Sequence, residues 1–215
     1  MIKVAPSILS ANPLILENEV KKVEEAGADY IHIDVMDGHY VPNITYGPNI
    51  IKYLKKITNI TLDVHLMITP VKHNLKSFID AGSDIISFHP EADNESEEII
   101  KMIKNSDCKC GIAIHPKIDV RDIMKYLPLV DMVIIMTVTP GFGGQKFMEE
   151  QTTKISEIKK IKNENNFNFE IEVDGGINNI TSKLCIEKGA EVLVAGSYIF
   201  NHPVDEYKKL IKSLK

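Results

Sequence analysis

The sequence has no tryptophan and only three cysteines among its 215 residues. So few cysteines, and an odd number of them, do not form the disulfide framework of a small secreted protein. No apolar run approaches the ~20 residues of a membrane-spanning helix, and no signal-peptide pattern follows Met1. We therefore expect a cytoplasmic protein with no membrane partner, in which Cys108 and Cys110 are ordinary thiols rather than metal ligands.

The charges also exclude a class of partner. Twenty-five Lys and Arg residues stand against thirty Asp and Glu, which gives a net charge of -5 without any basic stripe. Nucleic acid is therefore not an expected partner. A hydrophobic fraction of 44% is enough for a full core, and the length fits one large domain or two small ones.

A glycine turn recurs three times, at 25–29, 80–84 and 187–191, each time after an amphipathic stretch and before an apolar run. Glycine just past the end of a helix adopts the left-handed conformation, so each turn is predicted to join a helix to a strand. The remaining periodicity predicts eight strands, with seven helical segments between them and one after the last. The predicted strands are 3–8, 30–35, 61–67, 84–88, 109–114, 130–136, 169–174 and 191–195.

Strands that alternate with helices pair in parallel, and eight such units in a chain of this length favour a closed barrel. We therefore predict an α/β fold, a (β/α)8 TIM barrel, as a single domain over residues 1–215. The alternative is an open, doubly wound sheet.

Four of these strands carry polar or sulfur-containing residues at alternate positions, which places each set on one face. Buried, unpaired charges are costly, and a divalent metal is the simplest partner for them. We predict such an ion at the carboxyl ends of the strands, with Asp63 and Glu172 orienting its ligands from one step deeper. The sets are His32, Asp34 and Met36; Asp63, His65 and Met67; Met132, Ile134 and Met136; and Glu170, Glu172 and Asp174.

Mixed imidazole and carboxylate ligands suit Zn, Fe, Mn or Co, and the ligand types do not decide among them. The methionines Met36, Met67 and Met136 either close the barrel mouth as core residues or touch the substrate. His89 and His115, each followed by proline, remain open between a structural and a functional role.

Three glycine clusters follow the last three predicted strands, at 141–144, 175–176 and 196–197. Backbone amides without side-chain bulk can surround an anion, and barrels of this type often hold a phosphate after the seventh and eighth strands. Together the clusters predict a phosphorylated small-molecule ligand on the same rim as the metal.

Five segments, at 5–10, 32–38, 63–67, 140–145 and 172–176, closely resemble the ribulose-phosphate 3-epimerase family, and the resemblance covers essentially the whole chain. It implies an isomerase of the pentose phosphate pathway that interconverts D-ribulose 5-phosphate and D-xylulose 5-phosphate. The departures are Thr139, where the family usually has Asn or Glu, and His115, where Asn is common. Neither position is a predicted ligand or base.

The resemblance also implies roles for particular residues. Asp34 and Asp174 are the acid and base, and Ser7 and His65 contact the sugar. The implied metal ligands are His32, Asp34, His65 and Asp174, and the implied residues at the phosphate end are Gly141, Phe142, Gly143, Gly144, Gly175, Gly176, Gly196 and Ser197. One divalent metal, no organic cofactor and a homo-oligomeric assembly complete this expectation.

Inversion of the carbon beside a ketone requires proton removal on one face and proton return on the other. Two carboxylates could share that task, while a divalent ion stabilises the enediolate as a Lewis acid. The residues leave open which carboxyl group carries the proton. They also leave open a 3-epimerase of a related ketose phosphate such as allulose 6-phosphate, a metal-dependent phosphosugar hydrolase, and a non-catalytic phosphosugar-binding protein.

Overall fold

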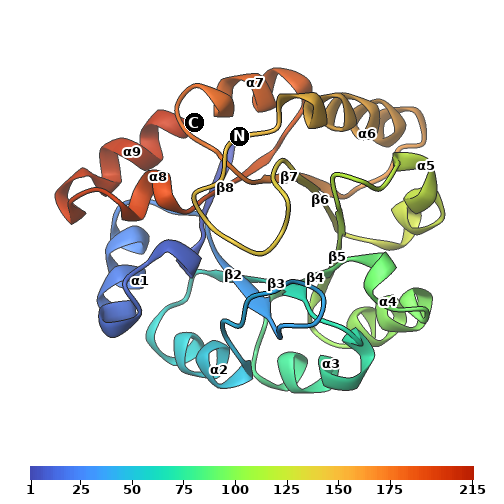
Figure 1. Cartoon of the computed structure of the whole chain (residues 1–215), viewed down its shortest axis with the longest axis horizontal. Coiled ribbons are helices and arrows are strands. Elements are labelled where there is room, and N and C mark those ends of the chain that lie inside the picture. The colour runs from blue at the N-terminus through green and yellow to red at the C-terminus, as the bar shows by residue number, and fades with distance from the viewer.

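Eight parallel strands form one sheet that curves into a barrel, with a ring of helices around it (Figure 1). The computed structural model describes residues 1–215. All eight predicted strands are present, and their bounds differ from the predicted ones by at most two residues. They are β1 Lys3–Pro6, β2 Tyr30–Met36, β3 Thr61–Met67, β4 Ile85–Phe88, β5 Lys109–Ile114, β6 Met132–Met136, β7 Glu170–Asp174 and β8 Val192–Ala195.

The strand order around the sheet is β1-β8-β7-β6-β5-β4-β3-β2, and every pairing is parallel. The first and last strands of this order meet through a single parallel bridge between Ser7 and His32. The sheet is thus a nearly closed barrel, and the predicted (β/α)8 fold is confirmed. An open, doubly wound sheet would leave its two edge strands apart, so that alternative is wrong.

The helices lie in the connections between the strands. They differ from the prediction at two places, before β6 and after β8. The segment before β6 contains only four α-helical residues and continues as a 3-10 helix that includes Pro128, because proline does not fit the interior of an α-helix. Two helices, not one, follow β8. The helices are α1 Leu16–Glu25, α2 Pro48–Ile57, α3 Val71–Asp80, α4 Ser96–Lys104, α5 Val120–Ile123, α6 Thr152–Glu164, α7 Thr181–Lys188, α8 Ser197–Phe200 and α9 Tyr207–Leu214.

The three repeated turns have the predicted conformation. Gly27, Gly82 and Gly189 follow α1, α3 and α7 with φ angles of 91°, 94° and 112°. Glycine adopts this left-handed region without the steric cost that a Cβ atom adds, so each turn can redirect the chain from helix to strand.

Alternate residues of each strand face opposite sides of the barrel. Ile31, Ile33 and Val35 of β2 belong to the large apolar core between the sheet and the helices. Tyr30 of the same strand belongs to a smaller cluster inside the barrel, together with Ile134 of β6. No helix is long and apolar enough to cross a membrane.

The barrel interior has polar layers as well as apolar ones. At its amino-terminal end, Lys3 pairs with Glu170, and Tyr30 donates a hydrogen bond to the same carboxylate at 2.8 Å. His32, Asp63 and Glu172 form the next polar layer along the barrel. The layer after it lies nearest the carboxyl ends of the strands. In the strand register Asp34 pairs with His65, and Met136 pairs with Asp174. The register therefore sets the two carboxylates and the imidazoles around one end of the barrel.

Candidate active site

Four side chains from three strands converge at the carboxyl end of the barrel. They are His32 and Asp34 of β2, His65 of β3 and Asp174 of β7, and one ligand atom of each lies within 4.8 Å of the others. His32 Nε2 is 3.5 Å from Asp34 Oδ1 and 3.9 Å from Asp174 Oδ2, and His65 Nδ1 is 3.7 Å from Asp34 Oδ1. The structure thus brings together the four residues predicted as metal ligands.

The free atoms of this cluster fit a metal ion. His32 Nε2 and His65 Nδ1 are fully buried and have no hydrogen-bond partner. Burial of an unpartnered polar atom is costly, so these two nitrogens need an occupant. Ligand atoms about 2.0–2.2 Å from one ion lie roughly 3–4 Å apart, which the observed spacing matches. The donor set of two imidazoles and two carboxylates suits a divalent transition metal.

The other nitrogen of His32 points deeper into the barrel. Its Nδ1 lies 2.6 Å from Asp63 Oδ2 and 3.4 Å from Glu172 Oε1. A metal-binding histidine commonly donates its second N–H to a carboxylate, which fixes its tautomer and orientation. The geometry is the one expected for Asp63 as a support of His32, whereas Glu172 lies beside the same nitrogen without a hydrogen bond to it.

The pKa values of the two carboxylates beside the pocket are displaced in opposite directions. Burial alone would raise the pKa of Asp34, but His32 and His65 outweigh it and hold that pKa well below its usual range. Burial and the charge of Asp34 together raise the pKa of Asp174 to about 6. Asp34 is therefore the more strongly ionised of the pair.

Deeper in the barrel, the pKa values of His32 and Glu172 are both raised. Burial alone would lower the pKa of His32, but the charges of Asp63 and Asp34 outweigh it and raise that pKa well above its usual value. Burial and the charge of Asp63 raise the pKa of Glu172 well above its usual value. In the metal-free protein, both groups therefore keep their protons at pH values where the unfolded chain releases them.

The free energy of unfolding of the metal-free protein should fall as pH rises above about 6.5, the ordinary pKa of histidine. Because the pKa values of His32 and Glu172 are raised on folding, the folded chain binds more protons than the unfolded chain, and stability decreases with pH. Each group contributes at most about 1.4 kcal/mol per pH unit. Urea unfolding at stepped pH, with a chelator present, measures this slope.

Glu172→Gln should flatten the slope, because glutamine has no proton to release. The matched control is Glu187→Gln, which changes an exposed glutamate on α7 and should leave the slope of the original protein. Equal slopes for all three proteins would contradict the assignment of this proton to Glu172.

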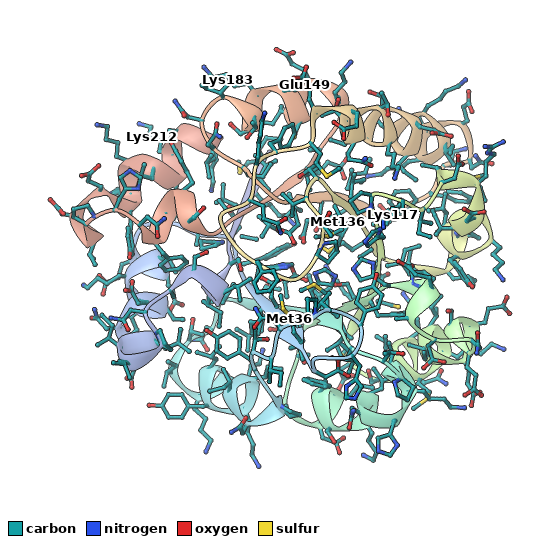
Figure 2. All side chains as sticks on the ribbon, viewed as in Figure 1. Met36, Lys117, Met136, Glu149, Lys183 and Lys212 are labelled. Atoms are coloured by element: carbon teal, nitrogen blue, oxygen red, sulfur yellow. The ribbon has the colours of Figure 1, made fainter.

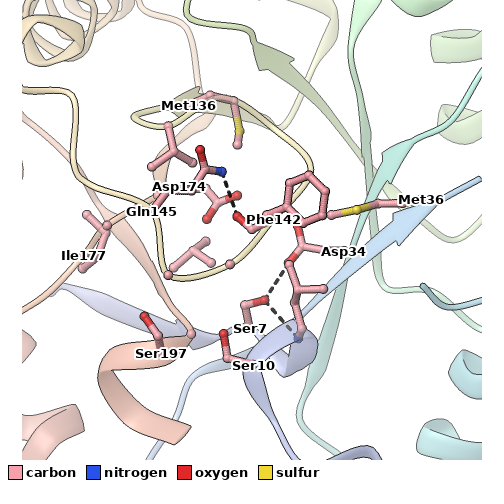
Figure 3. Close-up of a pocket in the computed structure, with 18 residues that line it drawn as sticks. Ser7, Ser10, Asp34, Met36, Met136, Phe142, Gln145, Asp174, Ile177 and Ser197 are labelled. Atoms are coloured by element: carbon pink, nitrogen blue, oxygen red, sulfur yellow. Dashed lines mark hydrogen bonds between the residues drawn. The ribbon is translucent and has the colours of Figure 1, made fainter. Parts of the chain in front are cut away.

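A pocket opens directly above the cluster (Figure 3). Asp34 and Asp174 line it, and Ser7 donates a hydrogen bond to Asp34 Oδ2 at 2.6 Å. Of the predicted substrate residues, most line this pocket, while His65, Met67 and Gly141 do not. The lining residues that the sequence predicted are Ser7, Asp34, Met36, Met136, Phe142, Gly143, Gly144, Asp174, Gly175, Gly176, Gly196 and Ser197.

The methionines lie around the barrel mouth. Met36 and Met136 line the pocket and appear near the middle of the barrel in Figure 2, whereas Lys183 and Lys212 lie on the periphery. Met67 is packed with Met36 and Val41 beside the pocket. Two of the three predicted methionines are thus placed where a ligand in the pocket would meet sulfur.

Two loops cover the mouth. The loop after β6, yellow in Figure 1, crosses over the middle of the barrel, and the loop after β2 lies close to it. Asn43 of the β2 loop donates its side-chain amide to the Gly141 carbonyl at 2.9 Å. Gln145 braces the β6 loop by donating to the carbonyls of Thr139 and Phe142 at 2.6 and 2.8 Å.

Sequence reasoning did not assign Ser10, Gln145 or Ile177 to the pocket, which all three line. It also left His89 undecided, although His89 Nε2 lies 3.1 Å from His65 Nε2. A signal for His89 was present: Ile85 and Ser87 of β4 share its parity, and parity places all three on the interior face.

The family model of the ribulose-phosphate 3 epimerase family matches residues 3–200. The chain is 47% identical to ribulose-phosphate 3-epimerase of Bacillus subtilis, over 100% of this chain and 99% of that protein. It is 45% identical to the chloroplastic ribulose-5-phosphate-3-epimerase of Arabidopsis thaliana, over 100% of this chain and 76% of that protein. The chain belongs to the ribulose-phosphate 3-epimerase family.

Solved structures outside the ribulose-phosphate 3-epimerase family share the fold. 3-Hexulose-6-phosphate synthase from Salmonella typhimurium superposes with a TM-score of 0.74 at 20% identity, covering 99% of this chain and 98% of that one. Identity this low supports the barrel alone. The resemblance read from the five sequence segments is confirmed by the family match, and the four-residue cluster lies within its bounds.

Proposed function

We propose that the protein catalyses the reversible epimerisation of D-ribulose 5-phosphate at C3, which yields D-xylulose 5-phosphate. The observation that carries this proposal is the pair Asp34 and Asp174, two carboxyl groups of different proton affinity on different strands that line one pocket. Membership of the ribulose-phosphate 3-epimerase family supports the same substrate.

Inversion needs two proton carriers. A single base returns a proton to the face from which it removed one, unless the substrate turns over. Asp34 comes from β2 and Asp174 from β7, so one can serve each face of a substrate carbon between them. The roles exchange in the reverse direction, because each carboxyl group leaves the reaction in the state that its partner began with.

The surroundings of Asp34 and Asp174 favour a different proton-transfer role for each. Asp34 is held ionised by His32 and His65 and accepts the Ser7 hydroxyl, so it is in the form that can accept a proton. Asp174 has its pKa raised to about 6, close to the range in which a carboxyl group can both hold and donate a proton. Its side chain is 15% exposed, whereas those of His32 and His65 are fully buried, so Asp174 is the more accessible of these to the substrate.

A divalent ion held by His32, Asp34, His65 and Asp174 would supply Lewis acidity to the negative charge that develops on the substrate oxygens. Zn, Fe, Mn and Co all suit these ligands. The reaction involves no redox step, and the proposal includes no organic cofactor.

The glycine rim accommodates the phosphate end in this proposal. A Cβ atom on Gly196 would lie 2.7 Å from Ser10 Oγ, and one on Gly176 would lie 2.8 Å from the Phe147 backbone nitrogen. Side chains at these positions would collide with these neighbours, whereas glycines leave backbone amides near the ligand. Ser10 and Ser197 add hydroxyl groups to the lining.

Location and assembly are part of the same proposal. The three cysteines are buried free thiols, which suits a reducing, cytoplasmic compartment. Leu14 and Tyr53 leave 91% and 50% of their surface exposed near α1 and α2, and such apolar area supports a homo-oligomer.

Proton NMR of D-ribulose 5-phosphate in deuterium oxide tests the reaction. The protein is stripped of metal and then reloaded with single divalent ions. We expect xylulose 5-phosphate that carries deuterium at C3, and only with a suitable ion present, because both carriers exchange their protons with solvent and the developing charge needs the ion.

The other functions give different spectra. Turnover of allulose 6-phosphate in place of the five-carbon substrate would shift the assignment to a six-carbon ketose phosphate. Release of inorganic phosphate without deuterium at carbon would indicate the hydrolase, and binding without any turnover would indicate a phosphosugar-binding protein. Either of these last two outcomes would contradict the epimerase proposal.

A further inference from the structure

His89 lies behind His65, on the side away from the four-ligand cluster. It follows β4 and is fully buried, as His65 is. The two Nε2 atoms are 3.1 Å apart, while His65 Nδ1 faces Asp34 Oδ1 at 3.7 Å. His65 therefore presents one ring nitrogen to the cluster and the other to His89.

A hydrogen bond between two imidazole nitrogens restricts both rings. One nitrogen must carry a proton and the other must be bare, because two N–H groups or two lone pairs repel. If His65 is to bind a metal through Nδ1, that atom must be bare and its Nε2 must carry the proton. His89 Nε2 is then the acceptor, and the proton of the His89 ring lies on Nδ1.

The surroundings of His89 favour that arrangement. Its Nδ1 has no hydrogen-bond partner but lies 3.4 Å from Glu91 Oε1, closer than His65 Nδ1 lies to Asp34 Oδ1, and a nearby carboxylate stabilises an N–H at this position. Tyr40 donates its hydroxyl to the same Glu91 oxygen at 2.8 Å and stacks on the His89 ring with centroids 4.8 Å apart. Glu91 is thus held by the β2 loop while it orients His89.

We propose that His89 is a positioning residue that fixes His65 in the Nε2–H tautomer and holds Nδ1 toward the metal. Glu91 sets the orientation of His89, and Tyr40 sets that of Glu91. The inference rests on the proposed function, because it concerns the same metal site. His32 has the corresponding support from Asp63, so each imidazole of the site has a buried partner on its far side.

The tautomer can be measured without metal, substrate or any change to His89. Long-range 1H–15N correlation spectra of the metal-free protein distinguish Nδ1–H from Nε2–H, and the His65 signals are assigned by their loss in His65→Gln. We expect His65 with its proton on Nε2. A proton on Nδ1 would overturn the proposal.

Metal affinity is the second readout. Zn²⁺ binding is measured by competition with a colorimetric chelator. His89→Leu removes the acceptor at similar volume and should weaken Zn²⁺ binding about 10- to 100-fold. His89→Gln should recover most of that loss, because its carbonyl can accept from His65 while its amide donates to Glu91. Glu91→Gln should weaken binding by a smaller factor in the same direction, and it also tests the proposal if His89→Leu does not fold.

His115→Asn is the matched control. Its ring meets that of His89 edge-on with centroids 6.3 Å apart, so this change also removes an imidazole next to His89 but leaves the His65 contact in place. Its Zn²⁺ affinity should equal that of the original protein. Unchanged affinity in both His89→Leu and Glu91→Gln would overturn the proposal. An original protein that binds no divalent ion would instead contradict the proposed metal site.

Discussion

Asp174→Asn should lower the rate of epimerisation at least about 10³-fold, because an amide neither accepts nor donates the proton at the pH of the reaction. The fold should persist, since asparagine has the same shape and the carboxylate is 15% exposed at the pocket rather than paired in the core. Binding of the phosphosugar should also persist, because the glycine rim is unchanged. Turnover is measured by NMR, and binding by quenched or displaced ligand signals in the same samples.

Asp205→Asn, an identical change at an exposed carboxylate before α9, is the control and should keep full turnover. The isotope pattern of Asp174→Asn adds a second test. If Asp34 still removes a proton from its own face, deuterium enters one epimer without inversion. Turnover of Asp174→Asn near the original rate would reject the two-base proposal.

The fold was predictable from the sequence because its signals are local. The strands are apolar runs, or segments that alternate apolar and polar residues, between turn residues, and glycine at 27, 82 and 189 identifies three helix ends. Parity along the strands then grouped His32 with Asp34, and Asp63 with His65, on interior faces. Parallel pairing then places these residues close together, because it brings the carboxyl ends of all strands to one rim.

The parts that the sequence did not predict depend on distances between segments. His89 lies beyond the end of β4, where parity places it inside the barrel, but only its 3.1 Å approach to His65 indicates a role at the site. The different pKa values of Asp34 and Asp174 depend on burial, on the approach of His32 and His65 to Asp34, and on the charge of Asp34 beside Asp174, which no spacing along the chain encodes. A helical segment was predicted before β6, but its short α-helical part was not, because Pro128 breaks a segment whose apolar periodicity still resembles a helix.

Gly175→Ala should destabilise the protein and disable the site together. Gly175 has a φ angle of 122°, and an added Cβ atom would lie 2.6 Å from Val138 Cγ2 and 2.8 Å from the Val138 backbone nitrogen. The segment cannot simply move away, because Thr137 donates hydrogen bonds to the carbonyls of Asp174 and Gly175 at 3.0 and 2.6 Å. Backbone strain and overpacking together should cost about 2–5 kcal/mol of the free energy of unfolding.

Comparison with Gly144→Ala separates backbone strain from overpacking. Gly144 lies on the same pocket rim with a φ angle of 71°, but an added Cβ atom would meet nothing within 4 Å. That variant should lose only the left-handed preference of glycine, about 1 kcal/mol. Urea unfolding compares the two. A larger loss of unfolding free energy in Gly175→Ala would indicate that the close approach of Gly175 to Val138 holds the end of β7, and with it Asp174, in place. That variant should then also lose proton transfer by Asp174. Equal losses in the two variants would mean that the rim needs glycine for its backbone conformation alone.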